Sequence, residues 1–269
     1  MPELPEVETV RRTLAPIVGA RITGAWTSGK GLHMNRRPPR ARLRALAGAT
    51  ITGLRRHGKY LLVDTDGPSS ILFHLGMTGR LRIHARRDPR ARHTHVIVQL
   101  GRRELRFTDP RRFGLCDVVA RDHVLVDLGP DPLVHGIDAT ALHDAARGRT
   151  VTLKAFVLDQ SVIAGVGNIY ASEALWRARL RPSLRAKRLT ATAAKRLAAA
   201  VGGVLADALA NNGTTLRDFV DADGERGDNS EYLDVYGRAG EPCPRCKTTI
   251  RRAVHQGRAT YYCPTCQTP

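Results

Sequence analysis

Residues 20–120 carry short runs in which apolar and polar positions alternate, a pattern that predicts β-strands. Period-two alternation is typical of antiparallel strands with one face in the core and the other in water. Turn signals such as Asp66-Gly67-Pro68 separate the runs, and no helical segment alternates with them. We therefore expect an antiparallel β-sandwich or a barrel. The predicted strands cover residues 51–54, 60–63, 71–75, 80–83, 95–100, 104–107 and 115–119.

Apolar residues recur at helical spacing on both sides of this strand-rich region. From Leu4 to Leu14 they stand three and four positions apart, and Pro5 suits the first turn of a helix. The longest helical pattern ends at Asn212-Gly213, which is a C-cap signal. Further helices are predicted over residues 139–147, 152–160, 168–179 and 190–211.

Two breaks in these patterns predict the domain organisation. The segment Leu128-Gly-Pro-Asp-Pro-Leu-Val-His-Gly separates the strands from the helices and indicates a linker. Residues 213–235 are polar and rich in Asp and Gly, so we expect a long loop that is mobile or ordered by a ligand. The chain is thus predicted to be an α+β protein. Its predicted parts are a β-sandwich domain at 1–128, a linker at 129–138, a helical module with the loop at 139–234, and a final segment at 235–269.

The net charge is the strongest compositional signal. Lys and Arg number 43 against 25 Asp and Glu, which gives a net charge of +18 and a pI near 10.7. Such a surplus indicates a polyanionic partner. An anionic membrane surface is a weaker alternative, because no basic amphipathic helix carries an aromatic apolar face. We see no apolar run long enough to span a bilayer and no signal peptide, so we expect a cytoplasmic protein.

Four of the five cysteines form two C-x-x-C pairs near the end of the chain. Cys243 and Cys246 are followed, after sixteen residues, by Cys263 and Cys266, a spacing that matches a four-cysteine zinc ribbon. A pair of disulfides is the alternative, and it is disfavoured in a cytosolic protein. We therefore predict one structural zinc ion, because four thiolates leave no open coordination position. The intervening segment predicts two short strands around Gln256-Gly257, and we expect its arginines to contact nucleic acid.

The first residues suggest a nucleophile. If Met1 is removed, Pro2 becomes an N-terminal secondary amine, and a terminal amine titrates near ~8. Such an amine can attack the C1′ atom of a sugar and form an iminium ion. Glu3 and Glu6 are candidate proton carriers beside it. A simpler interpretation stays open on this segment alone: Pro2 merely follows a start Met, and the two glutamates satisfy the helix dipole.

Several motifs together resemble one family, the bacterial formamidopyrimidine-DNA glycosylases. The N-terminal Pro2-Glu-Leu-Pro-Glu-Val-Glu-Thr is the first, and the terminal zinc ribbon is the last. The others are Gly58-Lys-Tyr-Leu-Leu, His74-Leu-Gly-Met-Thr-Gly, Thr108-Asp-Pro-Arg-Arg-Phe-Gly, Gly165-Val-Gly-Asn-Ile-Tyr-Ala-Ser-Glu and Val235-Tyr-Gly-Arg. Leu4 favours this branch over the related endonuclease VIII-like enzymes, which typically carry Gly there.

The resemblance implies a bifunctional enzyme of base excision repair. It would excise oxidised purines such as 8-oxoguanine and formamidopyrimidines from double-stranded DNA and cleave the abasic site by β,δ-elimination. It also implies an N-terminal β-sandwich that begins with the catalytic helix, then a helix–two-turn–helix module and a zinc finger. The family expectation is a monomeric bacterial protein with no cofactor in the chemistry itself.

The resemblance also assigns roles to individual residues. Pro2 corresponds to the nucleophile and Glu3 to the acid that assists opening of the sugar ring. Lys59 corresponds to the proton donor for β-elimination, and Arg258 to a zinc-finger arginine on the lesion phosphate. Glu6 would support the amine.

A second set of positions is implied to contact DNA. The flipped nucleotide leaves a void in the duplex, and the family fills it with side chains that match Met77, Arg111 and Phe113. On the residues alone, Met77 and Phe113 are better interpreted as core residues on strands. The expected contacts to DNA phosphates are Asn168, Lys154, Arg149 and His93.

One segment departs from the family pattern. Where the family commonly has an aromatic-rich stretch near the loop over the flipped base, this chain reads Gly227-Asp-Asn-Ser-Glu-Tyr-Leu. Recognition of the lesion is therefore open, and a preference for oxidised pyrimidines is the alternative within the family. A non-catalytic damage-binding protein is the alternative from a different class.

Overall fold

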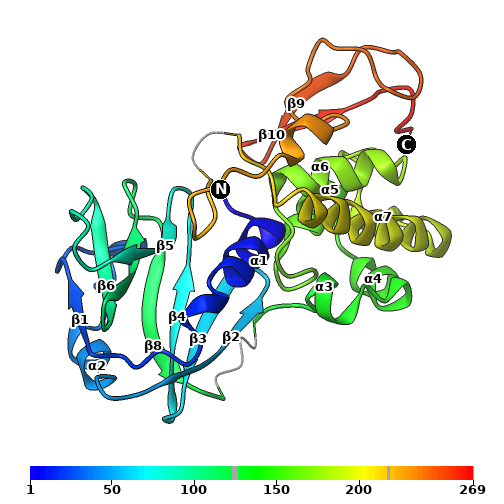
Figure 1. Ribbon diagram of the computed structural model, residues 1–269. Helices are drawn as coiled ribbons and strands as arrows, with labels where there is room; N and C mark the ends of the chain where they lie inside the picture. The colour runs from blue at the N-terminus through cyan, green and yellow to red at the C-terminus, as the bar shows by residue number, and fades with distance from the viewer. Residues whose placement is uncertain (123–126, 217–218, 269) are drawn as a thin grey trace. The chain divides into compact units, whose positions relative to one another are not determined.

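The computed structural model describes residues 1–122, 127–216 and 219–268, which form two compact units (Figure 1). The first unit comprises Met1–Leu125 together with Asn211–Asp228. The second comprises Val126–Ala210 together with Asn229–Pro269. Each unit is described by itself below.

Two antiparallel sheets of four strands build the first unit. One sheet runs in the order β1 (Gly24–Thr27), β6 (Thr94–Leu100), β7 (Arg103–Thr108) and β5 (Arg80–Ala85). The other runs in the order β2 (Ile51–His57), β3 (Tyr60–Thr65), β4 (Ser69–His74) and β8 (Leu115–Ala120). Short helical elements complete the unit: η1 (Ala15–Ile17), η2 (His33–Asn35) and α2 (Arg40–Ala45).

The apolar faces of the two sheets share one core. Phe73 on β4 and Phe107 on β7 lie with ring centroids 5.7 Å apart. Helix α1 (Leu4–Thr13) packs against β2 and β3 and adds Val7 and Val10 to this core (Figure 1). The predicted antiparallel sandwich that begins with an N-terminal helix is therefore confirmed. Cys116 on β8, the fifth cysteine, is buried, and burial raises the pKa of its thiol.

The segment after the longest helix packs on the sandwich, although the sequence analysis grouped it with the helical module. Phe219 and Ala222 are buried in the sandwich core. The backbone N–H of Ala222 donates to the hydroxyl of Thr13 on α1, at 3.1 Å. Arg82 on β5 donates to the carbonyl of Asp223, at 2.8 Å. These contacts anchor residues 219–228, so this part of the predicted loop is held by the protein's own residues. Two buried apolar side chains in a polar stretch give no periodicity from which a sequence analysis could detect the anchoring.

The second unit is helical up to residue 210. Its helices are α3 (Pro132–His135), α4 (Ala139–Ala146), α5 (Leu153–Leu158), α6 (Asn168–Arg177), η3 (Ala186–Arg188) and α7 (Ala191–Ala210), and η4 (Asn229–Tyr232) follows. The side chains of Asp138 and Thr152 cap α4 and α5 by accepting hydrogen bonds from backbone N–H groups. Helix α3 lies within the predicted linker, where Pro132 at its first turn follows the capping residue Asp131. Among the described residues, no helix combines the length and apolarity needed to cross a membrane.

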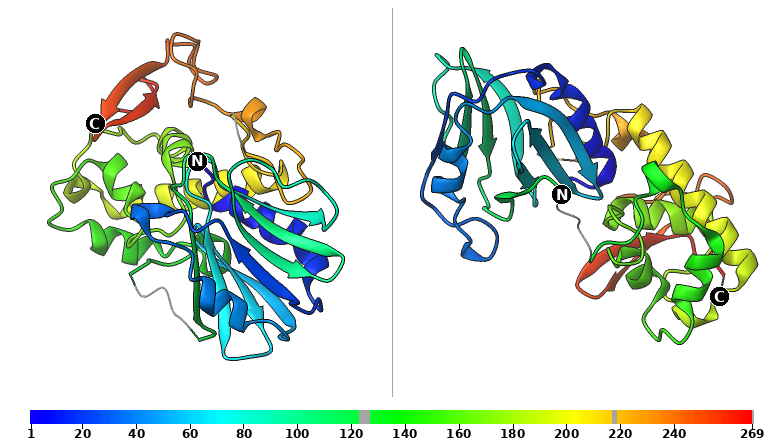
Figure 2. Two further views of the ribbon diagram at one scale, coloured as in Figure 1. Left: turned by 90° about the vertical axis from the view of Figure 1, so that its left-hand side faces the viewer. Right: turned by 90° about the horizontal axis from the view of Figure 1, so that it is seen from below.

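A β-hairpin near the end of the chain completes the second unit. Strands β9 (Arg251–His255) and β10 (Arg258–Tyr262) pair in antiparallel register, with His255 opposite Arg258. Gln256 and Gly257 both have positive φ, at 49° and 72°, which is the conformation of a tight type I′ hairpin turn. The predicted strand–turn–strand around these two residues is thus confirmed. Strand β10 packs beside α6 (Figure 2).

Candidate active site and nucleic-acid interface

The start of α1 holds the proposed nucleophile in a buried setting. Pro2 is buried whereas Met1 before it is about half exposed, at 49%. Glu3 is the N-cap residue of α1, and its backbone N–H donates to Glu6 Oε2 at 2.7 Å in a capping box. Removal of Met1 would therefore place a secondary amine directly ahead of a capped helix N-terminus, beside two carboxylates.

Glu6 also holds the first residues of the segment that follows α7 (Ala191–Ala210). Its second oxygen, Oε1, accepts the backbone N–H of Thr214 at 2.7 Å. Gly213, with φ of +83°, lies so close that a Cβ atom there would be 3.0 Å from Glu6 Oε1. Both carboxylate oxygens of this buried side chain thus accept backbone N–H groups, which suits a residue that positions the amine better than one that moves protons.

A hairpin turn presents Lys59 and is tied to the same helix. Gly58, with φ of 56°, and Lys59 join β2 to β3, and the Lys59 side chain is buried. Arg56 donates to the Gly58 carbonyl at 3.1 Å and forms an ion pair with Glu8 on α1, with Nε 2.9 Å from Oε2. Burial raises the pKa of Glu8, but hydrogen bonds from Arg11 and Arg56 outweigh it and lower the pKa to about 2. A permanently ionised Glu8 therefore links α1 to the turn that carries Lys59.

His74 lies near Lys59, and its motif alone did not indicate a role for it. Burial, followed by the positive charges of Lys59 and His33, lowers the pKa of His74 to about 4. Its Nδ1 accepts the backbone N–H of Gly76 at 3.1 Å, and its ring lies against that of Tyr60, with centroids 4.8 Å apart. A neutral His74 thus adds no positive charge next to Lys59 and orders the chain just before Met77.

Met77, Arg111 and Phe113 lie on exposed loops rather than on strands. Met77 is 38% exposed in the loop between β4 and β5, and Phe113 is 45% exposed in the loop between β7 and β8. The guanidinium carbon of Arg111 lies 5.0 Å from the centroid of the Phe113 ring. Because the side chains of Met77 and Phe113 are exposed, the interpretation of these two residues as core residues is wrong. His93 is exposed as well, and its carbonyl accepts the N–H of Asp109 at 3.0 Å, so it borders the second loop.

In the second unit, Asn168 connects the helical module to the terminal hairpin. It is the first residue of α6, after a turn in which Gly165 has φ of 90°. Its Nδ2 donates to the carbonyl of Ala259 at 2.9 Å, and its buried Oδ1 accepts no hydrogen bond from a described residue. Ala259 follows Arg258, whose side chain is exposed beside the hairpin turn. Asn168 therefore holds the strand that presents Arg258.

Of the expected phosphate contacts, Lys154 is buried, and Arg149 is partly exposed but paired with a carboxylate. Lys154 is 1% exposed, and its ammonium donates to the Asn168 carbonyl at 2.9 Å and to Ser172 Oγ at 2.5 Å. It points inward because it lies on the buried side of α5. Arg149 forms an ion pair with Asp159, with N and O 2.7 Å apart. Lys154 therefore supports the start of α6 from within, and Arg149 already has a carboxylate partner.

Glu173 is a further residue whose role sequence reasoning missed. This buried carboxylate on α6 accepts the backbone N–H groups of Asp234, Val235 and Tyr236, at 2.7–3.0 Å. Burial raises its pKa above the ordinary value, although the three N–H groups favour the ionised form. Glu173 thus fixes the start of the Val235-Tyr-Gly-Arg motif, and the hydroxyl of Tyr236 reaches Asn168.

The four predicted metal ligands converge. The sulfur atoms of Cys243, Cys246, Cys263 and Cys266 all lie within 4.8 Å of one another. Cys243 and Cys266 are 3.9 Å apart, and Cys246 and Cys263 are 3.4 Å apart. A tetrahedral site with Zn–S bonds of about 2.3 Å has sulfur atoms separated by about 3.8 Å. The residues therefore fit one zinc ion, with no position left for a reacting ligand.

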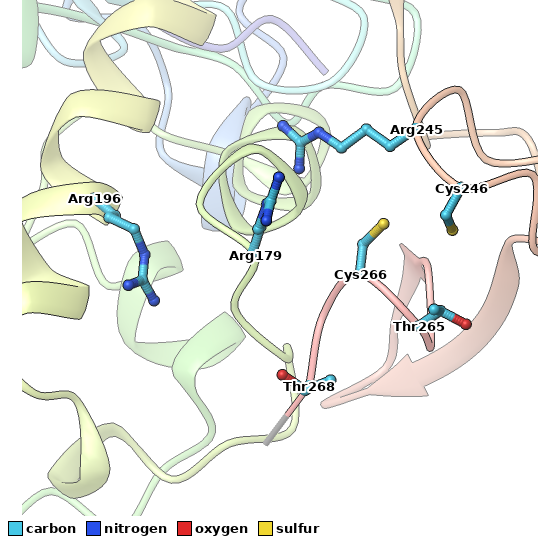
Figure 3. Close-up of a pocket in the computed structure, with 7 residues that line it drawn as sticks. All are labelled: Arg179, Arg196, Arg245, Cys246, Thr265, Cys266 and Thr268. Carbon is cyan, nitrogen blue, oxygen red and sulfur yellow. The ribbon is translucent and has the colours of Figure 1, made fainter.

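Three arginines and two of the cysteines line one cavity beside this cluster (Figure 3). Arg245 lies 3.8 Å from the centroid of the Trp176 ring and donates to the Trp176 carbonyl at 2.9 Å. Arg245, Arg179 and Arg196 line a cavity of about 680 Å³ with Cys246 and Cys266. A zinc ion with four thiolates carries a net charge of −2, and the C-terminus of α6 adds negative potential. The three guanidinium groups offset this charge, so the cavity is already balanced without an anionic ligand.

Three family models match successive parts of the chain. The Formamidopyrimidine-DNA glycosylase N-terminal domain matches residues 1–116, and the Formamidopyrimidine-DNA glycosylase H2TH domain matches residues 128–220. The zinc finger found in FPG and IleRS matches residues 240–269. The chain belongs to the formamidopyrimidine-DNA glycosylase family.

Relatives and solved structures support this membership along the whole chain. Formamidopyrimidine-DNA glycosylases of Alkalilimnicola ehrlichii and Xanthomonas campestris are each 46% identical to it, covering 99% of the chain and 100% of the relative. The structure of Lactococcus lactis Fpg with DNA containing N7-benzyl-Fapy-dG has a TM-score of 0.92 at 33% identity and covers 100% of both chains. Its complex with abasic-site DNA has a TM-score of 0.91 at 32% identity, covering 99% of this chain and 100% of that one.

Within each unit, the family's motifs come together in space. In the first unit the start of α1, the Lys59 turn and the two exposed loops all extend from one sandwich. In the second unit the Asn168 turn contacts the hairpin strand that begins at Arg258. The zinc cysteines converge as predicted from their spacing.

Proposed function

We propose that this protein is a bifunctional DNA glycosylase and abasic-site lyase that removes oxidised purines from double-stranded DNA. The observation that carries the proposal is the buried Pro2 directly ahead of the capped α1, with Glu3 and Glu6 around it. The positive end of a helix disfavours an ammonium ion, which raises the neutral fraction of an amine placed there. Family membership supports the substrate class, because the relatives are named formamidopyrimidine-DNA glycosylases.

The reaction begins once Met1 is removed and the damaged nucleotide is swung out of the duplex. The Pro2 nitrogen attacks C1′ and loses its N–H proton, the glycosidic bond breaks, and the electron pair of that bond leaves with the base, which takes up a proton. Glu3 donates a proton to the ring oxygen as the sugar opens, leaving an iminium between Pro2 and C1′. This intermediate joins enzyme and DNA covalently.

Strand cleavage follows from the same intermediate. Loss of a proton from C2′ expels the 3′ phosphate in β-elimination, with Lys59 as proton donor to the leaving group. Loss of a proton from C4′ then expels the 5′ phosphate in δ-elimination, with Arg258 stabilising the phosphate charge. Water hydrolyses the remaining iminium ion and frees Pro2.

The other exposed groups contribute to binding. Met77 and Phe113 supply apolar surface for the void left in the duplex, and Arg111 supplies donors for the orphaned base. Asn168 and Arg258 contact the phosphate backbone, with Lys154 acting through the Asn168 turn. The proposed partner is double-stranded DNA bound by a monomer, and a net charge of +18 favours that polyanion.

Borohydride trapping on a duplex with one abasic site tests the proposal. Borohydride reduces the iminium, so wild-type protein should give a covalent adduct, and peptide mapping should locate the sugar on Pro2. Pro2→Gly should trap far more slowly while still binding DNA. Pro16→Gly, at an exposed proline of η1 in the same unit, is the matched control and should trap normally.

Two results would overturn the proposed chemistry. An adduct mapped to a lysine side chain would show that another amine is the nucleophile. Absence of any adduct, with intact mass showing that Met1 has been removed, would indicate a non-catalytic damage-binding protein.

A preference for oxidised pyrimidines is the second candidate. Lactococcus lactis Fpg has been solved with oxidised-pyrimidine DNA, at a TM-score of 0.91 and 32% identity to this chain. The non-aromatic segment at Asp228 and Asn229 also leaves lesion choice open. Comparing kcat/KM on duplexes with 8-oxoguanine or thymine glycol separates the candidates, and a higher value for thymine glycol would favour the second.

A further inference from the structure

A buried aspartate joins the two loops that carry Met77, Arg111 and Phe113. Asp109 is 0% exposed and lies at the start of the second loop, directly after β7. Its Oδ1 accepts the hydroxyl of Thr78 in the first loop at 2.6 Å. Its Oδ2 accepts the backbone N–H of Gly114, at the end of the second loop, at 2.8 Å. One carboxylate therefore has a short hydrogen bond to each loop.

The two loops also touch backbone to backbone. Gly76 has φ of 63°, and a Cβ atom there would lie 2.5 Å from the Gly114 nitrogen and the Phe113 carbonyl carbon. The Thr78 hydroxyl oxygen accepts the backbone N–H of Arg111 at 3.2 Å. Met77 is thus flanked by two residues that contact the other loop, and neither loop can shift without the other.

The backbone of Asp109 is anchored to the sandwich. Its N–H donates to the His93 carbonyl at 3.0 Å. Its carbonyl lies 3.0 Å from His95 Nε2, and His95 Nδ1 lies 3.0 Å from the Ser28 hydroxyl. Among the described residues, no Lys or Arg forms an ion pair with Asp109. Burying a carboxylate without a counter-ion costs free energy, which the two hydrogen bonds to the loops offset in part.

We propose that Asp109 is a positioning residue that holds Met77, Arg111 and Phe113 in one rigid arrangement, so that they enter the void in the duplex together. The inference rests on the proposed function, because it requires these three residues to fill that void. Asp109 itself does not touch DNA. Its effect follows from preorganisation: loops held in their working geometry lose less conformational freedom on binding.

The test compares a substrate that has a void with one that has none. The first is a duplex with 8-oxoguanine opposite cytosine, and the second is a single-stranded oligonucleotide with one abasic site. Asp109→Asn keeps the size of the side chain but replaces one acceptor with a donor, so one of the two hydrogen bonds is lost or must run in the reverse direction, toward the Thr78 oxygen that already accepts the Arg111 N–H. We expect excision from the duplex to fall by about tenfold to a hundredfold, and borohydride trapping on the single strand to change little.

Variants of Thr78 and of a second carboxylate test whether the loss in Asp109→Asn comes from the contact between the loops. Thr78→Val removes the hydroxyl that bridges the loops and should reproduce the selective loss, whereas Thr78→Ser retains the hydroxyl and should restore duplex activity. Asp117→Asn, on β8 with its partner Arg42, is the control for loss of a carboxylate elsewhere in the sandwich. If Asp109→Asn does not fold, the two Thr78 variants carry the test. Equal losses on both substrates, or none on the duplex, would overturn the inference.

A second readout follows the void itself. With 2-aminopurine opposite a stable abasic analogue, side chains that enter the void change its fluorescence on binding. Asp109→Asn should reduce that change at saturating protein. Met77→Ala distinguishes a failure of the void-filling role from a failure of the role of Asp109. If it leaves the ratio of duplex to single-strand activity unchanged, the void-filling role itself fails. If it lowers the ratio and Asp109→Asn does not, only the role of Asp109 fails.

Discussion

Replacing Glu8 tests the connection between α1 and the Lys59 turn. Glu8 accepts hydrogen bonds from Arg56, which is 3% exposed, and from Arg11 and Arg12, which are 33% and 58% exposed. Its pKa lies near 2 rather than at the ordinary 4.5, a difference equivalent to about 3 kcal/mol. Solvent screens the two outer arginines, so we expect Glu8→Gln to lower the free energy of unfolding by about 2 kcal/mol.

The pH dependence of this effect has a defined sign. The pKa of Glu8 is lower in the folded protein than in the unfolded chain, so the stabilisation is complete above about pH 4.5 and declines as the pH falls toward 2. The stability difference between wild type and Glu8→Gln should therefore narrow by roughly 1 kcal/mol between pH 7 and pH 3.5. Urea denaturation followed by circular dichroism at both pH values measures it.

The arginine partners supply matched controls for the same experiment. Arg56→Met leaves Glu8 without its buried partner and should cost about as much as Glu8→Gln. Arg12→Met removes an exposed partner of the same carboxylate and should cost less than about 1 kcal/mol. A stability difference that stays constant with pH, or equal costs for the two arginine variants, would refute the reasoning.

Three other measurements address zinc, salt and the loop contact. Removing zinc with a chelator should make residues 240–268 more sensitive to proteolysis and weaken DNA binding, and unchanged affinity would count against a role for the hairpin. The logarithm of the DNA association constant should fall linearly with the logarithm of salt concentration, by about 0.9 per phosphate contact, and a flat response would contradict a charged interface. Gly76→Ala should destabilise the protein by about 1–3 kcal/mol more than Gly101→Ala, since both positions have positive φ but only Gly76 meets backbone atoms. Equal losses of unfolding free energy at the two positions would mean that the positive φ alone, and not the contact with the other loop, causes the destabilisation.

Much of the architecture could be predicted from local patterns. The spacing of the cysteines, the Gln256-Gly257 turn and the long apolar stripe of α7 each express one short-range rule, and each is found in the structure. The strands of the sandwich follow from alternation, because one face of each sheet is buried in a common core.

What escaped prediction depends on contacts between segments far apart in the chain. Phe219 and Ala222 join a core built mostly from residues before 120. Lys154 is a charged residue whose inward orientation depends on Ser172 and the Asn168 carbonyl. Asp109 and Glu173 were visible in the motifs, but their partners are identified only by the folded chain. Residue types therefore indicate the chemistry, whereas the supporting hydrogen bonds require the three-dimensional structure.

The exposure of Met77 has a chemical consequence for an enzyme of this kind. Its thioether lies in the open, at 38% exposure, whereas the thiol of Cys116 is buried and protonated. Reactive oxygen species that damage purines also convert methionine to its sulfoxide, which is polar. A polar side chain would no longer suit the apolar gap between bases that Met77 is proposed to fill. Oxidative stress would thus blunt the repair of its own lesions until a sulfoxide reductase restored the thioether.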